Sequence, residues 1–292
     1  MDWGRAKTIL IAILLMLNAV LAGTIVSRAT GSGADDRIYR DVAQILENRG
    51  ISMQCEFPKN IRSSAMLVYE GGASRAALMA QALASYAGVA YAVLGEEGEA
   101  LAAGGSGKRV ELVGSESIRY ACDFPTEALP MGSEEPLGDA LRDALSGMGI
   151  DMSQFALDSV KWHRADAGED GGATARFVQV YQGSLVFDSY ISVRVTPDGG
   201  IAEVAARLRG IRGLSPNKPM KVAPAYQVIL RHYSKSGQAI RSIDIGFMGQ
   251  SAASGDAFIE SEEGAVWRVR LAEGSDRYFE ASYGDEVFMD DL

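Results

Sequence analysis

Histidine and cysteine are scarce in this chain of 292 residues, which contains two of each. His163 follows a tryptophan at an expected strand end, and His232 stands at the C-terminus of an expected helix. These positions suit surface or capping roles rather than acid–base chemistry. The two cysteines form no Cys-x-x-Cys pair and have no histidine nearby, which excludes a zinc site of the usual spacing.

The chain also lacks complete catalytic motifs. It has no Gly-x-Ser-x-Gly elbow, and the one Ser-x-x-Lys match, at 215–218, lies in a proline-containing loop without its companion motifs. The glycine-rich stretch 104–108 lacks the first glycine and the final Ser or Thr of a phosphate-binding loop. The acidic pairs do not have calcium-loop spacing. We therefore expect a protein that is not an enzyme and that uses no cofactor or metal.

The formal net charge is −10 at pH 7, and 47% of the residues are hydrophobic. An acidic surface repels the phosphates of DNA and RNA, so nucleic acid is excluded as a partner. The hydrophobic content is typical of a packed protein rather than a disordered one.

One long apolar run is present, at residues 8–26, which are 19 residues without a charge. As a helix it would be ~28 Å long, close to the thickness of bilayer hydrocarbon. Arg5 and Lys7 precede it, which places residues 1–7 in the cytoplasm and the bulk of the chain outside, in a single-pass cell-membrane protein. A cleaved signal peptide, ending before Gly23, is the alternative that the sequence leaves open.

Asn18 lies inside this apolar run, and small residues surround it. Ala19 and Gly23 form a small-xxx-small pair, and Ala22 lies one turn from Asn18. Such a face allows another helix to approach closely, and an amide in hydrocarbon gains by bonding across the contact. We predict that Asn18, Ala19, Ala22 and Gly23 bind a partner helix, the alternative being that Asn18 bonds its own backbone.

The opening residues, MDWGRAKTILIAILLMLNAVLAG, resemble the start of the YycI family. Beyond them the agreement is in length and layout. The resemblance implies a membrane-anchored, non-enzymatic accessory regulator of the sensor histidine kinase WalK (YycG), which controls cell-wall metabolism in Gram-positive bacteria. Its implied partners are the kinase's transmembrane helix and extracellular domain, and a co-regulator of the related YycH type. A tethered extracellular binding or inhibitory module with no kinase partner is the alternative.

Cys55 and Cys122 occur in similar settings, each at the end of an expected strand and shortly before a proline. Outside the cytoplasm a disulfide bond between them is permitted. Two buried free thiols are the alternative, because sequence does not show whether the two Cβ atoms lie at bonding distance.

The remaining chain predicts an α+β fold with two extracytoplasmic domains, each a set of helices on an antiparallel sheet. Residues 27–34 form a linker, and the polar segment bracketed by Pro130 and Pro136 separates a first domain at 35–129 from a second at 130–292. The stretch 177–200 also resembles PepSY-type modules.

Two elements carry specific expectations. A helix that ends at Gly50 should bury a face of four apolar residues, Ile38, Val42, Ile45 and Leu46. The strand at 185–196 alternates apolar and polar residues, with Asp188 on the polar side, which predicts a half-buried antiparallel strand.

Overall fold

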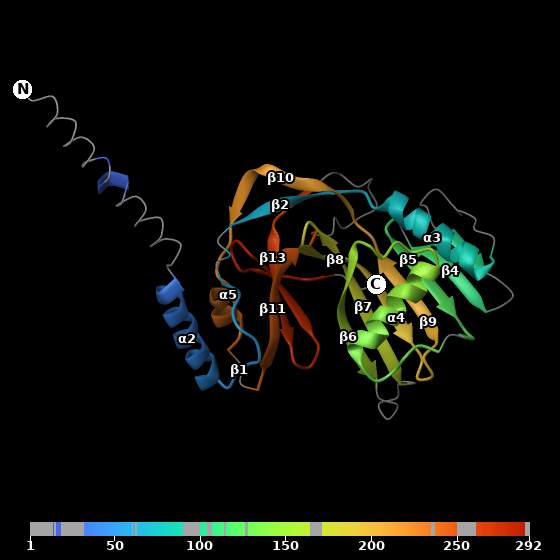
Figure 1. Ribbon diagram of the computed structural model, residues 1–292, viewed down its shortest axis with the longest axis horizontal. Coiled ribbons are helices and arrows are strands. Elements are labelled where there is room, and N and C mark those ends of the chain that lie inside the picture. The colour runs from blue at the N-terminus through green and yellow to red at the C-terminus, as the bar shows by residue number, and fades with distance from the viewer. Residues whose placement is uncertain are drawn as a thin grey trace, which may run out of the picture.

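The computed structural model describes most of the chain beyond residue 31 (Figure 1). The described residues are 14, 16–18, 32–59, 61, 63–89, 100–103, 107–113, 115–125, 128–163, 171–234, 237–249 and 261–289. Residues 1–7, 27–31 and most of the predicted span at 8–26 therefore lie outside them. Among the residues that the structure does describe, no helix combines the length and apolar character needed to cross a membrane.

A twelve-stranded sheet forms the centre of the molecule. Its main path runs through β15 (Glu286–Val287), β14 (Asp276–Glu280), β13 (Ala265–Leu271), β11 (Ala239–Phe247), β8 (Ser184–Val195), β9 (Ile201–Arg207), β5 (Ser117–Cys122), β4 (Lys108–Val113) and β3 (Ala100–Ala103). Off this path, β6 (Phe155–His163) pairs with β7 (Gly172–Tyr181), β7 pairs with β8, and β1 (Ser52–Met53) pairs with β11. The sheet is mixed, because β11 runs parallel to both β8 and β1.

A second, three-stranded sheet has the order β10 (Gly210–Lys221), β2 (Ser63–Glu70), β12 (Ser261–Glu263). Its central strand comes from the first quarter of the chain, and the strands on either side come from the last third. Strand pairing in this sheet therefore joins the beginning of the described chain to its end.

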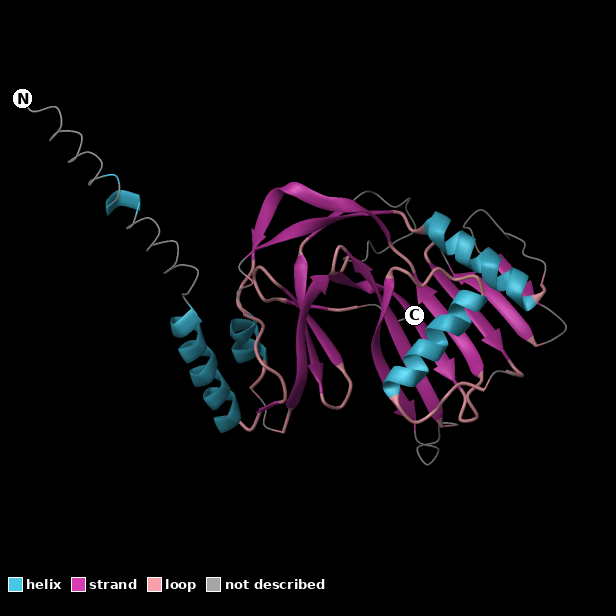
Figure 2. Cartoon of the chain, viewed as in Figure 1, coloured by secondary structure: helices cyan, strands magenta, loops and turns pink. Residues whose placement is uncertain are grey.

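The buried apolar residues form three clusters, and the two largest define two lobes, which are seen side by side in the cartoon (Figure 2). We define the middle lobe as residues 73–208, in which α3 (Ala73–Ala87) and α4 (Glu134–Gly147) cover the sheet and enclose a core running from Ala76 to Leu208. We define the terminal lobe as residues 32–70 and 210–289, with a core on α2 (Ser32–Asn48), α5 (Ala225–His232) and the strands around β11. The middle lobe is thus inserted into the chain of the terminal lobe.

This arrangement shows that the predicted α+β fold of two successive PepSY-like domains, each with its own antiparallel sheet, is wrong. Strands from before residue 130 pair with strands after it: β1 with β11, β2 with β10 and β12, and β5 with β9. Local patterns locate strands, but strand partners depend on pairing across long sequence separations, which those patterns do not encode.

β8 connects the two lobes, because different parts of one edge pair with different strands. Leu185 and Val186 pair with β11, whereas the residues from Tyr190 to Val195 pair with β9. On the other edge, Gln179 of β7 is opposite Val186 and Val178 is opposite Tyr190, so residues 187–189 of β8 have no partner on β7. This break in register places Asp188 and Ser189 between the lobes, where both are buried.

Candidate functional site

Asn18 is the one residue of the predicted partner-binding face that the structure describes. Its Nδ2 donates a hydrogen bond of 2.9 Å to the carbonyl oxygen of Leu14, one turn earlier in the same helix. Ala19, Ala22 and Gly23 lie outside the described residues. The alternative in which Asn18 bonds its own backbone is therefore present in the structure, and the partner-helix interface stays a prediction.

Cys55 and Cys122 are both free thiols, and they lie in different lobes. Cys122 is buried in the core of the middle lobe, whereas Cys55 is half-buried beside the core of the terminal lobe. Burial, and then the negative charge of Asp244, raise the pKa of the Cys55 thiol. Of the two alternatives for this pair, the structure contains two separate thiols.

α2 is the first helix after the predicted anchor, and it is firmly packed on the terminal lobe. Val42 and Leu46 are buried, the latter completely. Tyr39 stacks on Phe57 with ring centroids 5.7 Å apart, and meets the edge of Tyr226 on α5 at 5.6 Å. Aromatic pairs of this geometry stabilise a contact by more than the burial of their surface alone. These two pairs therefore hold α2 against the lobe on two sides.

The buried face of α2 differs in part from the predicted one. Ile38 and Ile45 are 41% and 42% exposed, whereas Tyr39 takes a position against the lobe. The predicted face was too wide, because α2 contacts the lobe along a narrow strip between α5 and the segment after β1. The predicted end at Gly50 is confirmed by its left-handed φ of 75°, which favours glycine.

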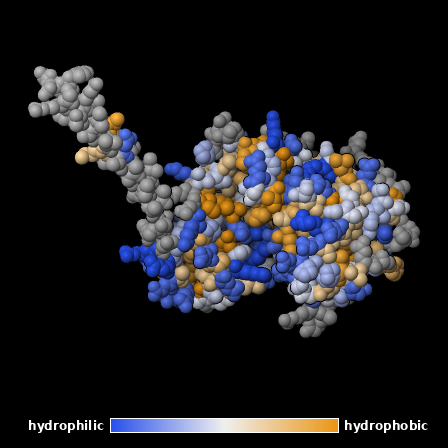
Figure 3. All heavy atoms as spheres, viewed as in Figure 1, coloured by the Kyte–Doolittle hydropathy of each residue, from blue (hydrophilic) through white to orange (hydrophobic). Residues whose placement is uncertain are grey.

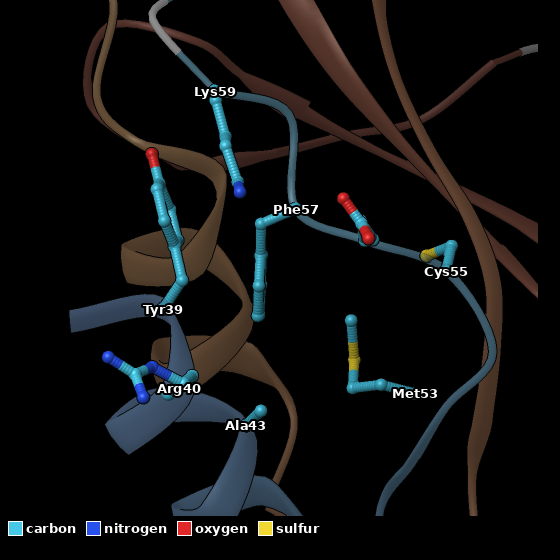
Figure 4. Close-up of a pocket in the computed structure, with 8 residues that line it drawn as sticks. Tyr39, Arg40, Ala43, Met53, Cys55, Phe57 and Lys59 are labelled. Atoms are coloured by element: carbon cyan, nitrogen blue, oxygen red, sulfur yellow. The ribbon is translucent and has the colours of Figure 1, made fainter. Parts of the chain in front are cut away.

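A pocket of about 450 Å³ opens beside this helix, and we call it the α2 pocket (Figure 4). One wall comes from α2, with Tyr39, Arg40 and Ala43. The other wall is the end of β1, with Met53, and the segment after it, with Cys55, Glu56, Phe57 and Lys59. Its volume is within the range of small-molecule sites in proteins, and its lining combines aromatic and sulfur-containing side chains with a few charged ones.

The charged groups of the α2 pocket lie around its rim. Lys59, Arg40 and Glu56 are exposed, whereas Phe57 is buried. In the close-up, Lys59 reaches toward the space between the rings of Tyr39 and Phe57, and Met53 lies at the opposite end (Figure 4). Lys59 therefore puts a positive charge at one end of the pocket, whereas Arg40 lies on α2 beside Ala43, away from Lys59 (Figure 4).

A second group of polar residues joins the two lobes at the break in β8, and we call it the Asp188 junction: Tyr69, Glu116, Asp188 and Arg209. Arg209 donates from Nε to Asp188 Oδ2 at 2.9 Å and also pairs with Glu116. Asp188 accepts two further bonds, from the Tyr69 hydroxyl at 3.2 Å and from the Gly249 amide at 3.1 Å. Because each buried charge is paired and hydrogen-bonded, the junction can exist inside the protein.

A third group, the Arg268 junction, consists of Asp158, Asp244, Arg268, Arg270 and Asp276. Asp158 belongs to β6 of the middle lobe, and both arginines belong to β13 of the terminal lobe. The carboxylate of Asp158 accepts from Arg268 Nη1 at 2.7 Å and from Arg270 Nη2 at 2.6 Å. These side chains are largely buried, and on the surface above them hydrophilic and hydrophobic residues both reach the region where the lobes meet (Figure 3).

The pKa of the buried aspartate is raised in the Asp188 junction and lowered in the Arg268 junction. Burial raises the pKa of Asp188 and outweighs the charge of Arg209, which lowers it. Burial also opposes ionisation of Asp158, but there the positive charges of Arg268 and Arg270 prevail, so the pKa of Asp158 is lowered. Asp158 is therefore an ionised group that ties the lobes together.

Neither junction has the arrangement of a catalytic centre. Their charged groups neutralise one another inside the protein, and His163 and His232 are elsewhere. His163 Nε2 lies 2.8 Å from Thr174 Oγ1, and His232 Nε2 lies 2.7 Å from the carbonyl oxygen of Gly284. Within the described part of the chain, no three His, Cys, Asp or Glu side chains are grouped so that they could hold a metal ion.

Sequence reasoning missed both junctions and the α2 pocket. For the Arg268 junction a signal was present, since Arg268 and Arg270 interrupt the apolar run Ala-Val-Trp-Arg-Val-Arg-Leu at positions that share one face of a strand. Two arginines on the face of an otherwise buried strand require acidic partners from elsewhere in the chain.

No family model and no curated protein matches this chain. A solved structure does resemble it, the crystal structure of an uncharacterized protein from Eubacterium rectale ATCC 33656. The TM-score is 0.52 and the sequence identity 10%, over 82% of this chain and 91% of that chain. At this identity the likeness concerns the fold alone, and the fold does not specify a function.

Proposed function

We propose that this chain is a membrane-anchored, non-enzymatic accessory regulator of a WalK-type sensor histidine kinase, acting through its anchor and its extracytoplasmic lobes. The observation that carries the proposal is the packing of α2. Only five residues separate the apolar run ending at Val26 from the start of α2 at Ser32. A helix so close to the anchor, and fixed to the terminal lobe by Val42, Leu46 and Tyr39, can transmit a movement of that lobe to the anchor.

The resemblance of the first residues to the YycI family supports the choice of partner. Arg5 and Lys7 ahead of the apolar run support an orientation with the lobes outside the cytoplasm. A co-regulator of the YycH type is a further partner under this proposal. The kinase's extracellular domain is the second surface that the lobes would contact.

The test is co-purification with the kinase from membranes. The full-length chain is compared with a variant in which residues 8–26 are replaced by an unrelated apolar span of equal length. We expect the full-length chain to retain the kinase and the exchanged span to lose most of it. Equal retention by both would show that the span is only a tether, and no retention by either would contradict the proposal.

Membrane attachment needs its own measurement. The full-length chain should stay in the membrane fraction after washing with salt and carbonate, and detergent should release it. The signal-peptide alternative gives a different product, a protein in the soluble extracytoplasmic fraction that begins near Gly23, and N-terminal sequencing distinguishes the two. Recovery of that product alone would overturn the anchor.

A tethered extracellular binding module is the second candidate function, and the α2 pocket favours it. A pocket of about 450 Å³ with aromatic walls is typical of proteins that bind a small ligand. This function requires no kinase, so the chain with the exchanged span would keep it in full.

A further inference from the structure

The α2 pocket has two ends of different chemistry. Met53, Ala43 and the rings of Tyr39 and Phe57 offer apolar surface, and Phe57 is only 7% exposed. Figure 4 shows Lys59 at the other end, reaching toward the space between the two rings. A ligand that matches this pocket has an apolar part for the walls and a charged group for the end at Lys59.

The charges at the rim decide the sign of that group. Arg40 and Lys59 are positive and Glu56 is negative, so the titratable groups that line the pocket have a net positive charge. Tyr39, Phe57 and Tyr226 might suggest an aromatic site for a cation, but the two positive side chains at the rim repel one. Charge complementarity therefore favours an anion.

We propose that the α2 pocket binds a small amphiphilic anion, an apolar chain or ring that carries one carboxylate or phosphate group. Such a molecule reaches the pocket either from the bilayer or from solution outside the cell. The proposal rests on the binding module given above as the second candidate function and names the class of its ligand. It needs no kinase, so it and the regulatory function can fail independently.

Cys55 allows ligand binding in the α2 pocket to be measured, because its thiol lies in the pocket wall and the other cysteine, Cys122, is buried in the middle lobe. The protein is the full-length chain with Cys122→Ser, in nanodiscs of phosphatidylcholine, whose headgroup has no net charge. Alkylation of Cys55 by iodoacetamide is followed by mass spectrometry at alkaline pH, because burial raises the pKa of this thiol.

Laurate is the first probe. A ligand in the pocket covers Cys55, so the alkylation rate should fall by the factor 1 + [L]/Kd, about tenfold at a laurate concentration of roughly nine times its Kd. Dodecyltrimethylammonium has the same chain with the opposite charge, and acetate is the head group alone. Neither should protect Cys55, and equal protection by laurate and the cation would overturn the proposal.

Two exposed residues provide matched variants. Lys59→Gln should weaken protection by laurate about fivefold, whereas Lys59→Arg should preserve it. Glu56→Gln removes a negative charge from the same segment and should leave laurate binding equal or tighter. Because these side chains are exposed, the variants should fold, which their thermal melts check. Unchanged protection in Lys59→Gln and weaker protection in Glu56→Gln would together overturn the assignment of the charged end.

The source of the ligand is distinguished by the bilayer. Nanodiscs that contain phosphatidylglycerol offer an anionic phosphate lipid with no added laurate. Slower alkylation of Cys55 in these nanodiscs would support a ligand taken from the membrane. Protection by laurate without protection by phosphatidylglycerol would support a ligand from solution, and protection by neither would overturn the proposal.

Discussion

Arg209 and Asp188 face each other at the point where β8 leaves its register with β7, with Arg209 Nε 2.9 Å from Asp188 Oδ2. Arg209 stands between β9 of the middle lobe and β10 of the terminal lobe, whereas Asp188 is on the strand that the lobes share. Both side chains are almost fully buried. A movement of one lobe relative to the other would therefore displace the two members of this pair.

Removing one member of this pair should destabilise the whole protein. Arg209→Met leaves Asp188 and Glu116 buried without their cation, which should lower the free energy of unfolding by ~3–5 kcal/mol. Adding Asp188→Asn to Arg209→Met should cost less than the sum of the two single changes, because the partners disappear together. Urea unfolding of the full chain in mild detergent, followed by tryptophan fluorescence, measures these differences.

The control is an exposed ion pair in the same sheet. Arg119 is 57% exposed and pairs with Glu203 across β5 and β9, so Arg119→Met should change the free energy of unfolding by only ~0–1 kcal/mol. If Arg209→Met were as mild as Arg119→Met, the Asp188 junction would not be holding the lobes together.

Acid should weaken the Arg268 junction. The pKa of Asp158 is lowered in the folded protein, so as pH falls the unfolded chain, with an aspartate pKa of ~3.9, takes up this proton first. The stability that Asp158 supplies is therefore complete above about pH 5 and is lost progressively below about pH 4. The measurement is the free energy of unfolding as a function of pH.

Asp158→Asn tests the origin of that pH dependence. The variant should be less stable at neutral pH, because Arg268 and Arg270 lose a buried carboxylate, and its stability should fall less steeply in acid. Asp123→Asn changes a half-exposed partner of Arg109 and should leave the acid slope unchanged. An identical slope in the protein and in Asp158→Asn would contradict the assignment.

The two thiols should be chemically distinct. Titration of the unfolded chain under non-reducing conditions should find two free thiols, and none would show a disulfide bond instead. In the folded chain Cys55 should react first, because Cys122 is only 7% exposed in the middle lobe. Reaction of Cys55 should also accelerate as pH rises toward its raised pKa.

How far the sequence predicts this fold is clearest at α2. Val42 and Leu46 were expected in the core and are buried there, since helical spacing places them on one face. Ile38 and Ile45 have equally apolar side chains but are partly exposed. The spacing identifies the apolar side of a helix, whereas the width of the contact depends on neighbours such as α5, which are far away in sequence.

Asp188 shows why the interior between the lobes escaped prediction. Asp188 alternates with apolar neighbours, which indicated that its side chain faces solvent. That inference holds for a strand that keeps one register along its whole length. The structure has three residues of β8 without a partner on β7. Arg209, from the link between β9 and β10, and Tyr69, from β2, hydrogen-bond the carboxylate. Neither the break nor the approach of Tyr69, which is 119 residues away, has a local signature.

The partner-helix prediction can now be stated for individual atoms of Asn18. Its Nδ2 already donates to the carbonyl oxygen of Leu14, but an amide nitrogen has a second hydrogen and Oδ1 accepts as well. The side chain can therefore bond its own helix and a neighbouring helix at the same time. Because one bond is made within the helix, the gain from a second one across the contact should be modest, ~0.6–2 kcal/mol.

Asn18→Leu and Gly23→Ile should weaken association with the kinase in membranes by different means. The first removes the amide, and the second holds the two backbones apart, so each should reduce co-purification several-fold at ~1 kcal/mol. Leu17 lies on a different side of the helix, so Leu17→Ile is the matched control and should leave co-purification near that of the unchanged chain. Expression and orientation are checked for each variant. If Asn18→Leu and Gly23→Ile combined retain as much kinase as Leu17→Ile, recognition lies in the lobes, and the apolar run serves only to hold them at the membrane.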